Sequence, residues 1–168
     1  MRAVLLLLLM LPGATSAATF IVTKEADDDG PCMPDDCALR EAIIAANAFP
    51  DTDIVEVPAG TYQLSLQGPP ENFSMTGDLD ISYDLVLRGE SARSVTVIGD
   101  GTDRVLQVGT VKGTVEISGM TITGGVGEFG GGVFVAGPES ILLENLTIRD
   151  NTSLFSVGGG SPSARQTL

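Results

Sequence analysis

Alternating apolar and polar residues fill most of this chain, in short stretches that recur at a nearly constant spacing. Residues 115–122 align with residues 141–148 at an offset of 26, and residues 85–89 align with residues 115–119 at an offset of 30. Three further matches are 95–99 with 120–124 at an offset of 25, 105–108 with 133–135 at about 28, and Phe129 with Phe155 at 26. A period of two is that of a half-buried β-strand, and self-similarity over tens of residues marks repeat architectures. The pattern predicts an all-β chain of stacked coils.

Each predicted coil contains three short strands that lie beside their equivalents in the next coil. The strands are 79–81, 85–87 and 95–98 in one coil, 105–108, 115–117 and 120–122 in the next, and 133–135, 141–143 and 146–148 in the third; 54–57 and 62–66 make an incomplete first coil. The alternation places Ile117, Ile122, Leu143 and Ile148 on one side, where neighbouring coils stack aliphatic side chains. About four coils are expected, a small number for a solenoid.

Glycine and asparagine occupy equivalent sites between two strands of successive coils. These sites are Gly89, Gly119 and Asn145. Both residue types tolerate a left-handed backbone, which a tight corner needs. We therefore predict a tight corner at each of the three sites.

A strand at residues 19–23 and a short amphipathic helix precede the coils. The helix is expected from Cys37 to Asn47, with an apolar face made of Leu39, Ala42, Ile43 and Ala46 and with Arg40 and Glu41 off that face. Asp35 or Asp36 is expected to cap its start, and Phe49-Pro50 to end it. The apolar face needs a surface to cover, and the open end of a strand stack provides one.

The segment Cys37-Ala-Leu-Arg-Glu-Ala42, with Val-Pro-Ala-Gly-Thr-Tyr at 57–62, carries a family resemblance. It closely resembles the Cys-Ser-Leu-Arg-Glu-Ala (CSLREA) segment near the N-terminus of secreted, mostly bacterial, right-handed parallel β-helix proteins. Ala38 stands where that family usually has Ser or Thr. The resemblance implies a right-handed parallel β-helix, a pectate-lyase-like solenoid, with an N-terminal strand and helix as its cap.

The N-terminal residues have the pattern of a targeting segment. Arg2, the apolar run 4–11 and the small residues 14–18 predict a signal peptide that is cleaved after Ala17 or Ala18. The later apolar runs are too short to span a bilayer. The expected divisions are a signal peptide at 1–18, a cap at 19–52, coils at 53–155 and an irregular tail at 156–168. The chain is thus predicted to be secreted, extracellular or on the cell surface.

The tail departs from the repeat. Residues 155–160 begin with the same sequence pattern as residues 129–135, but residues 161–168 do not continue it. Three interpretations stay open: a longer β-helix cut short, a disordered natural tail, or an open coil end closed by self-association with another subunit.

The net charge narrows the classes of partner. Nine basic residues against 22 acidic ones give a formal net charge of −13, which argues against nucleic acid as a partner.

The two cysteines, Cys32 and Cys37, predict a disulfide that pins the loop before the helix. The rival interpretation, half of a zinc site, lacks a histidine and a third cysteine to complete it.

Candidate chemistry is sparse, and no catalytic, cofactor-binding or metal residue is assigned. The absence of histidine excludes histidine-based triads. The candidates for a lyase are the arginines Arg88, Arg93, Arg104 and Arg149. The candidates for a glycosidase are the acidic pairs Asp78 with Asp80 and Asp100 with Asp103. Residues 27–30 are the candidate for weak calcium binding. Surface charge explains the arginines, and turn composition explains Asp100 and residues 27–30. Asp78 and Asp80 share a strand parity and could project from one face.

The sequence favours a non-catalytic extracellular or cell-surface module that is adhesive or binds a glycan or a surface protein. The alternatives are a carbohydrate-active enzyme, either a polysaccharide lyase or a glycoside hydrolase, and an inactive truncated fragment of a longer β-helix protein. Fold alone does not decide among them.

Overall fold

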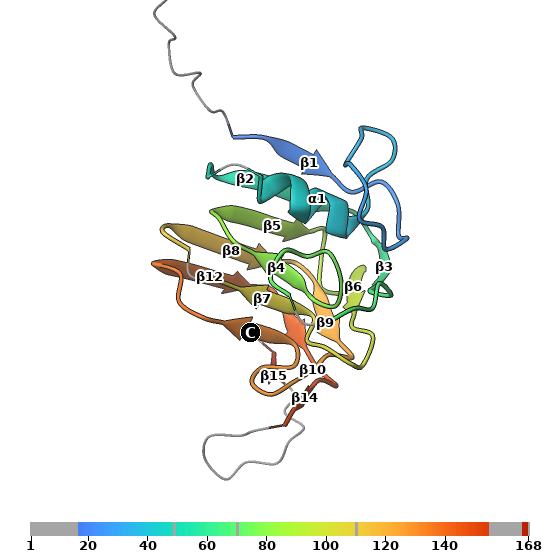
Figure 1. Cartoon of the computed structure of the whole chain (residues 1–168), viewed down its shortest axis with the longest axis vertical. Coiled ribbons are helices and arrows are strands. Elements are labelled where there is room, and N and C mark those ends of the chain that lie inside the picture. Colours follow the sequence, from blue (N-terminus) through green and yellow to red (C-terminus); the bar gives the residue numbers. More distant parts are fainter. Residues whose placement is uncertain (1–16, 49, 70, 110, 155–165, 168) are drawn as a thin grey trace, which may run out of the picture.

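The computed structural model describes residues 17–48, 50–69, 71–109, 111–154 and 166–167, and in this part the chain is mostly β (Figure 1). The helix α1 is Leu39–Ala46, and the strands are β1 Thr19–Ile21, β2 Asp53–Val57, β3 Gly60–Gln63, β4 Leu79–Ile81, β5 Leu85–Gly89, β6 Val95–Ile98, β7 Leu106–Val108, β8 Thr114–Ser118, β9 Thr121–Thr123, β10 Val126–Gly127, β11 Val133–Val135, β12 Ser140–Glu144, β13 Thr147–Ile148, β14 Thr152–Ser153 and β15 Gln166–Thr167. The predicted signal peptide, apart from Ala17 and Ala18, lies outside the described residues, as do Phe49 and residues 155–165.

Three stacked sheets are visited by the chain in turn. Sheet 1 has the order β1-β2-β5-β8-β12, sheet 2 the order β15-β13-β9-β6-β3, and sheet 3 the order β11-β7-β4. Each circuit adds one strand to every sheet, and every pair in these sheets is parallel except β13 with β15. A small sheet of β10 and β14 lies beside them. The predicted all-β class with parallel stacking is confirmed. The tail, predicted to be irregular, contributes β15.

The strand register agrees with the sequence repeats. Val115 lies opposite Ile141, an offset of 26, and Leu85 lies opposite Val115, an offset of 30. In sheet 2, Val97 lies opposite Ile122, an offset of 25. In sheet 3 the pairing of Leu106 with Val133 gives 27 instead of the expected 28 or so.

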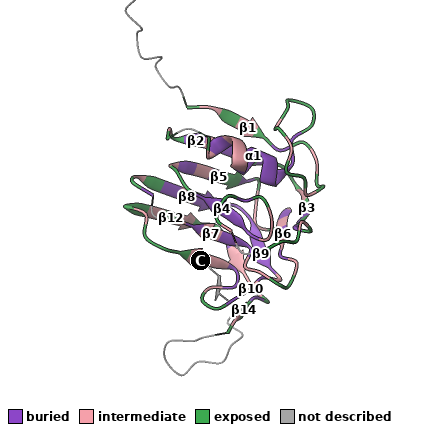
Figure 2. Cartoon of the chain, in the orientation of Figure 1, coloured by how far each residue is buried: buried purple, intermediate pink, exposed green. Residues whose placement is uncertain are grey.

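Columns of buried aliphatic residues form the core between the sheets. Figure 2 shows buried residues along the strands. In sheet 1, Val55, Leu87 and Ile117 follow one another in register and are almost wholly buried. Leu143 continues this column but is only half-buried, because β12 is the last strand of sheet 1 in the described residues. Each fully buried side chain of this size contributes about 1.5–3 kcal/mol of transfer free energy, so the stack itself supplies the core.

Two of the three predicted corners are left-handed, and the third is not. Gly119 has φ +69° and Asn145 has φ +53°. Gly89 ends β5 and is absent from the positive-φ residues, so the prediction of a left-handed corner there is wrong. A Cβ on Gly89 would lie 2.2 Å from the carbonyl oxygen of Gly119. Glycine is needed at that site because two successive circuits approach closely.

The disulfide is confirmed, whereas the predicted acidic helix cap is wrong. Cys32 and Cys37 are bonded. The helix begins at Leu39 after an extended Ala38, whose backbone N–H donates to Glu41 Oε2 at 2.7 Å. Asp35 and Asp36 are too early to cap it, because the backbone of Cys37 is already tied to the segment after β1. Glu41 therefore supplies the capping carboxylate.

Arg40, placed off the apolar face by the sequence pattern, is completely buried. Its Nε and Nη2 donate to the two carboxylate oxygens of Asp27, at 2.7 and 3.2 Å. Its Nη1 donates to the carbonyls of Ser74 and Asp78, and its Nη2 to that of Gly77, at 2.8–3.2 Å. All five guanidinium N–H groups thus have an acceptor.

The free edge of β4 is closed by side chains. Asn47, just after α1, donates from Nδ2 to the carbonyl of Asp80 at 2.6 Å and accepts the N–H of Ser82 at 2.9 Å. The hydroxyl of Ser74 accepts the N–H of Asp80 at 2.6 Å. These side chains take the place of a neighbouring strand, so the backbone groups of this edge are paired.

We predict that Arg40→Met strongly destabilises the fold. It leaves the Asp27 carboxylate buried without its counter-ion, and loss of one partner of a buried pair costs about 3–5 kcal/mol. The measurement is the urea midpoint followed by circular dichroism.

Arg88→Met is the matched control, because Arg88 is half-exposed and lies 3.8 Å from Glu56. Its loss should cost less than about 1 kcal/mol. Equal midpoints for the two variants would contradict the role assigned to Arg40.

Candidate functional site

Asp78 and Asp80, one of the acidic pairs weighed from the sequence, lie together beneath the loop 71–77. Asp80 is the middle residue of β4 and lies opposite Gln107 of β7. Its carboxylate accepts the backbone N–H of Ser74 at 2.9 Å and the amide of Gln107 at 3.0 Å. Only 4% of Asp78 and 2% of Asp80 is exposed. The two carboxyls are therefore neighbours, as the sequence pattern suggests, but both are almost wholly buried.

Arg104 belongs to this cluster, so its interpretation as a surface charge is wrong. Its Nε lies 3.6 Å from a carboxylate oxygen of Asp78, and its side chain is 20% exposed. Its Nη1 donates to the side-chain oxygen of Gln107. Its guanidinium carbon lies 4.9 Å from the ring centroid of Phe134, a cation–π contact.

Burial controls the ionisation of the two carboxyls. It raises the pKa of Asp78 to about 7, and the neighbouring Asp80 and Asp103 carboxylates raise it further than Arg104 lowers it. Burial likewise raises the pKa of Asp80 to about 6, against the backbone hydrogen bond from Ser74 that lowers it. Two carboxyls with raised pKa beside an arginine resemble an acid–base pair, but a substrate would first have to displace the loop 71–77.

Among the other candidates from the sequence, Asp103 borders this cluster, with a carboxylate oxygen 3.9 Å from Arg104 Nε, whereas Asp100 and Arg149 have local partners. Asp100 accepts the N–H groups of Thr102 and Asp103 at 2.8 and 3.2 Å, so the predicted turn is confirmed. Burial opposes but does not outweigh these hydrogen bonds and the one from the Thr102 hydroxyl, and the pKa of Asp100 is lowered. Arg149 pairs with Asp150 at 2.6 Å.

The acidic segment 27–30 is tied to basic side chains. Asp27 is the partner of Arg40, and Asp28 lies 2.8 Å from Lys24. Within the described residues, no group of three or more carboxylate, thiol or imidazole side chains is placed to hold a metal ion.

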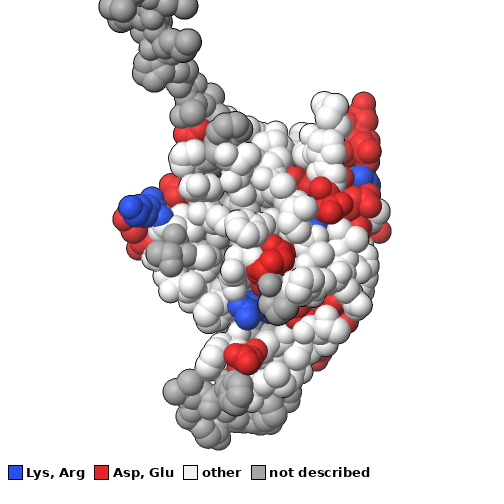
Figure 3. Space-filling model, in the orientation of Figure 1, with Lys and Arg blue, Asp and Glu red and all other residues white. Residues whose placement is uncertain are grey.

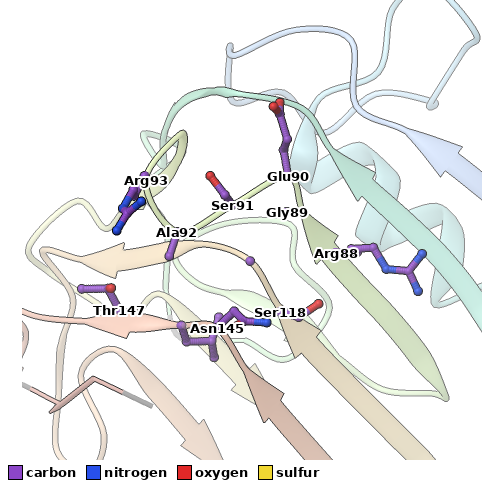
Figure 4. A pocket seen from close by; sticks show the side chains of 11 residues that line it. Arg88, Gly89, Glu90, Ser91, Ala92, Arg93, Ser118, Asn145 and Thr147 are labelled. Atoms are coloured by element: carbon purple, nitrogen blue, oxygen red, sulfur yellow. The ribbon is translucent and has the colours of Figure 1, made fainter.

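An open cavity of about 550 Å³ lies where the chain passes from sheet 1 to sheet 2 (Figure 4). Three successive circuits line it, through residues 88–93, residues 118–119 and residues 145–147. The second and third of these connections are the tight corners at Gly119 and Asn145. The first is the longer loop 90–94 between β5 and β6. We call this cavity the corner notch.

The loop above the corner notch is held in place from both sides. The hydroxyl of Thr121 donates to the carbonyl of Ala92 at 2.7 Å. The N–H of Glu90 donates to the carbonyl of Val57 at 3.0 Å, and the carboxylate of Glu90 accepts the N–H of Ala59 at 3.1 Å. A loop fixed by neighbouring circuits presents its side chains with little entropy to lose on binding.

Four polar side chains of the corner notch make no hydrogen bond or ion pair with any described residue. They are Arg93, Ser118, Asn145 and Thr147. They come from three circuits, and together they offer guanidinium and amide donors, an amide acceptor and two hydroxyls. Most of the buried polar side chains elsewhere, including Arg40 and Asp80, are already engaged. The corner notch is therefore the best candidate for ligand contact.

The sequence predicts Arg93 to be a surface charge and predicts no cavity beside it. A usable signal was present in the repeats, whose offset falls from 30 residues in sheet 1 to 25 in sheet 2. The five-residue difference is the extra length of the loop between β5 and β6 relative to the next corner. An unequal offset therefore marks the position of an overhanging loop.

Comparisons of the chain with protein-family models, with curated proteins and with solved structures found no match. In the described residues no helix is long and apolar enough to cross a membrane. Function is therefore inferred from the geometry of the corner notch and of the cluster at Asp78.

We predict that the fold loses stability as the pH rises from the ordinary carboxyl pKa of 3.8 to about 7, the raised pKa of Asp78. A carboxyl whose folded-state pKa is above its ordinary 3.8 contributes stability that is complete below that value and is lost as the pH passes the folded-state pKa. Asp78→Asn should flatten this part of the profile and stabilise the protein at pH 8.

Urea midpoints from pH 5 to pH 8 measure the effect. Asp100→Asn is the control, because the pKa of Asp100 is lowered and the group does not titrate in this window. Parallel profiles for wild type and Asp78→Asn would show that the carboxyl is not the cause.

Proposed function

We propose that this chain is a secreted, non-catalytic, right-handed parallel β-helix module of the CSLREA type that binds a glycan in the corner notch. The repeated circuit through three parallel sheets supports the fold. The Cys32–Cys37 disulfide supports an oxidising, extracellular location. The resemblance of residues 37–42 to the CSLREA segment supports both.

The observation that carries the binding function is the set of unengaged polar side chains at the corner notch. A sugar offers several hydroxyls at short spacing, each able to donate and accept. Concave sites with a few fixed polar groups recognise such ligands, because every group left unpaired on either side would lower the affinity. Ser118, Asn145 and Thr147 supply those groups from two neighbouring circuits.

Burial of the carboxyls supports a non-catalytic module over the lyase or glycosidase alternative. Asp80 is held by Ser74 and Gln107, and Asp78 lies beside Arg104 beneath the loop 71–77. The cluster and the corner notch are built from different parts of the circuit, β4 and β7 on the one hand and the β5–β6 loop on the other. A glycan in the corner notch would not reach the buried carboxyls.

We predict that the full chain retains oligosaccharides on an affinity column without cleaving them, and that Asn145→Gly weakens retention. Glycine keeps the left-handed corner and removes only the amide, so the loss should be about three- to tenfold, the worth of one hydrogen bond. Reducing-end and unsaturated-uronide assays on the same samples monitor cleavage.

Asp150→Gly is the matched control, because Asp150 is exposed, has φ +55° and does not line the corner notch. Release of shorter products would favour the carbohydrate-active enzyme. Retention that Asn145→Gly leaves unchanged would place binding elsewhere on the molecule.

A further inference from the structure

We infer that the glycan residue held in the corner notch carries a single carboxylate, as a uronic acid does, and that Arg93 binds it. This inference rests on the proposed glycan-binding function and specifies its ligand class. It starts from an exposed arginine that has no partner among the described residues, at a cavity whose other free groups are neutral.

Arg93 is placed to act as an anion anchor. It follows Ala92, the residue that Thr121 fixes at 2.7 Å, and its side chain lies on the Thr147 side of the corner notch in Figure 4. A guanidinium offers parallel N–H donors that match a carboxylate in two-point geometry. The fixed loop limits the entropy lost when such a contact forms.

The other charged residues at the rim are already neutralised or face away. Glu90 points away from the cavity in Figure 4, and its carboxylate accepts the backbone N–H of Ala59. Arg88 lies 3.8 Å from Glu56. Glu144, opposite Ser118 in the register, does not line the cavity. Arg93 is thus the charge at the corner notch that lacks a counter-ion within the described chain.

The net charge of the protein limits the ligand to few charges. With 22 acidic residues against nine basic ones, a densely charged polyanion is repelled along its length. Figure 3 shows acidic side chains gathered over the loop that joins β1 to α1. Repulsion beyond about 10 Å is screened at moderate salt, so one carboxylate beside Arg93 gains the short-range contact without the long-range penalty. The fit is to a sparsely charged acidic glycan.

The test compares three probes on the full chain by calorimetry: an oligosaccharide with one uronic acid residue, its methyl ester, and a densely sulfated polysaccharide. The acid should bind about tenfold more tightly than the ester, from one charge-assisted hydrogen-bonding contact. Arg93→Gln should reduce the acid to the affinity of the ester and leave the ester unchanged. Lys112→Gln, an exposed charge in the loop before β8, should change neither.

The outcomes separate this inference from the function beneath it. Equal binding of acid and ester, unchanged in Arg93→Gln, would overturn the carboxylate assignment and leave glycan binding in place. Failure of both probes to bind would overturn both. Tighter binding of the sulfated polymer than of the single acid would overturn the argument from net charge.

A different contact supports a second inference: the mature chain begins at Ala18, and its α-ammonium pairs with Asp53. We infer this from the predicted signal peptide together with the backbone nitrogen of Ala18, which lies 2.7 Å from a carboxylate oxygen of Asp53. Asp53 is 4% exposed, and its carboxylate has no other hydrogen-bond donor among the described residues.

Hydrolysis of the Ala17–Ala18 bond by signal peptidase consumes one water and leaves Ala17 as a carboxylate and Ala18 as an ammonium. The new charge strengthens the existing contact. Cleavage after Ala18 would instead leave Asp53 as a buried carboxylate without its donor, which is costly. The carbonyl of Ala18 also accepts the N–H of Ile54 at 2.9 Å, so the residue is part of the β1–β2 pairing.

N-terminal sequencing and the intact mass of the secreted chain test the cleavage point, and a chain that begins at Thr19 would overturn it. Asp53→Asn should lower the urea midpoint at pH 6 more than at pH 9, because an α-amino group has a pKa of about 8 and loses its charge between them. Asp51→Asn, at a half-buried neighbour, is the control. A pH-independent effect of Asp53→Asn would overturn the ion pair.

Discussion

The constraint on which this structure depends is that the first strand of a parallel stack has no neighbour on one side to pair with its backbone hydrogen-bonding groups. Backbone N–H and carbonyl groups that face no further strand must find partners or remain in water. At β4 the partners are side chains, and Arg40 fixes the loop that carries one of them, Ser74. The same guanidinium is held by Asp27, which also accepts the N–H groups of Ser65 and Leu66. One buried ion pair thus joins the N-terminal loop to the start of the stack.

The arrangement of the strands could be predicted because it follows from local and periodic information. Alternation assigns each strand residue to the core or to the surface, and equal spacing assigns each strand its neighbour. The pairings of Ile117 with Leu143 and of Ile122 with Ile148 follow from the repeat alone. A shift of one residue would turn every aliphatic side chain outward, so the register has little freedom.

The features that could not be predicted depend on partners distant in the sequence. A charged residue outside an apolar stripe is normally exposed, and nothing near Arg40 indicates that carbonyls 34 to 38 residues away surround it. The local pattern predicts a left-handed backbone at Gly89, whereas glycine is required there because Gly119 of the next circuit lies so close. The local pattern predicts a helix cap at Asp35 or Asp36, but the backbone N–H of Cys37 is held by the hydroxyl of Thr23. In each instance the tertiary contact, which the local pattern does not contain, decides the outcome.

The corner notch and the core are formed by different residues, so a change in one need not disturb the other. Tight corners at Gly119 and Asn145 are fixed by the stacking of the circuits, whereas the loop 90–94 stands outside the strands. Extra loop residues between β5 and β6 leave the pairing of both strands intact, because the offset changes only between sheets. Arg93 therefore sits where its chemistry can change with little effect on the buried columns. The side chains at this corner and the stability of the strand ladder can therefore vary independently, because loops on a rigid scaffold tolerate change more readily than the packed strands do.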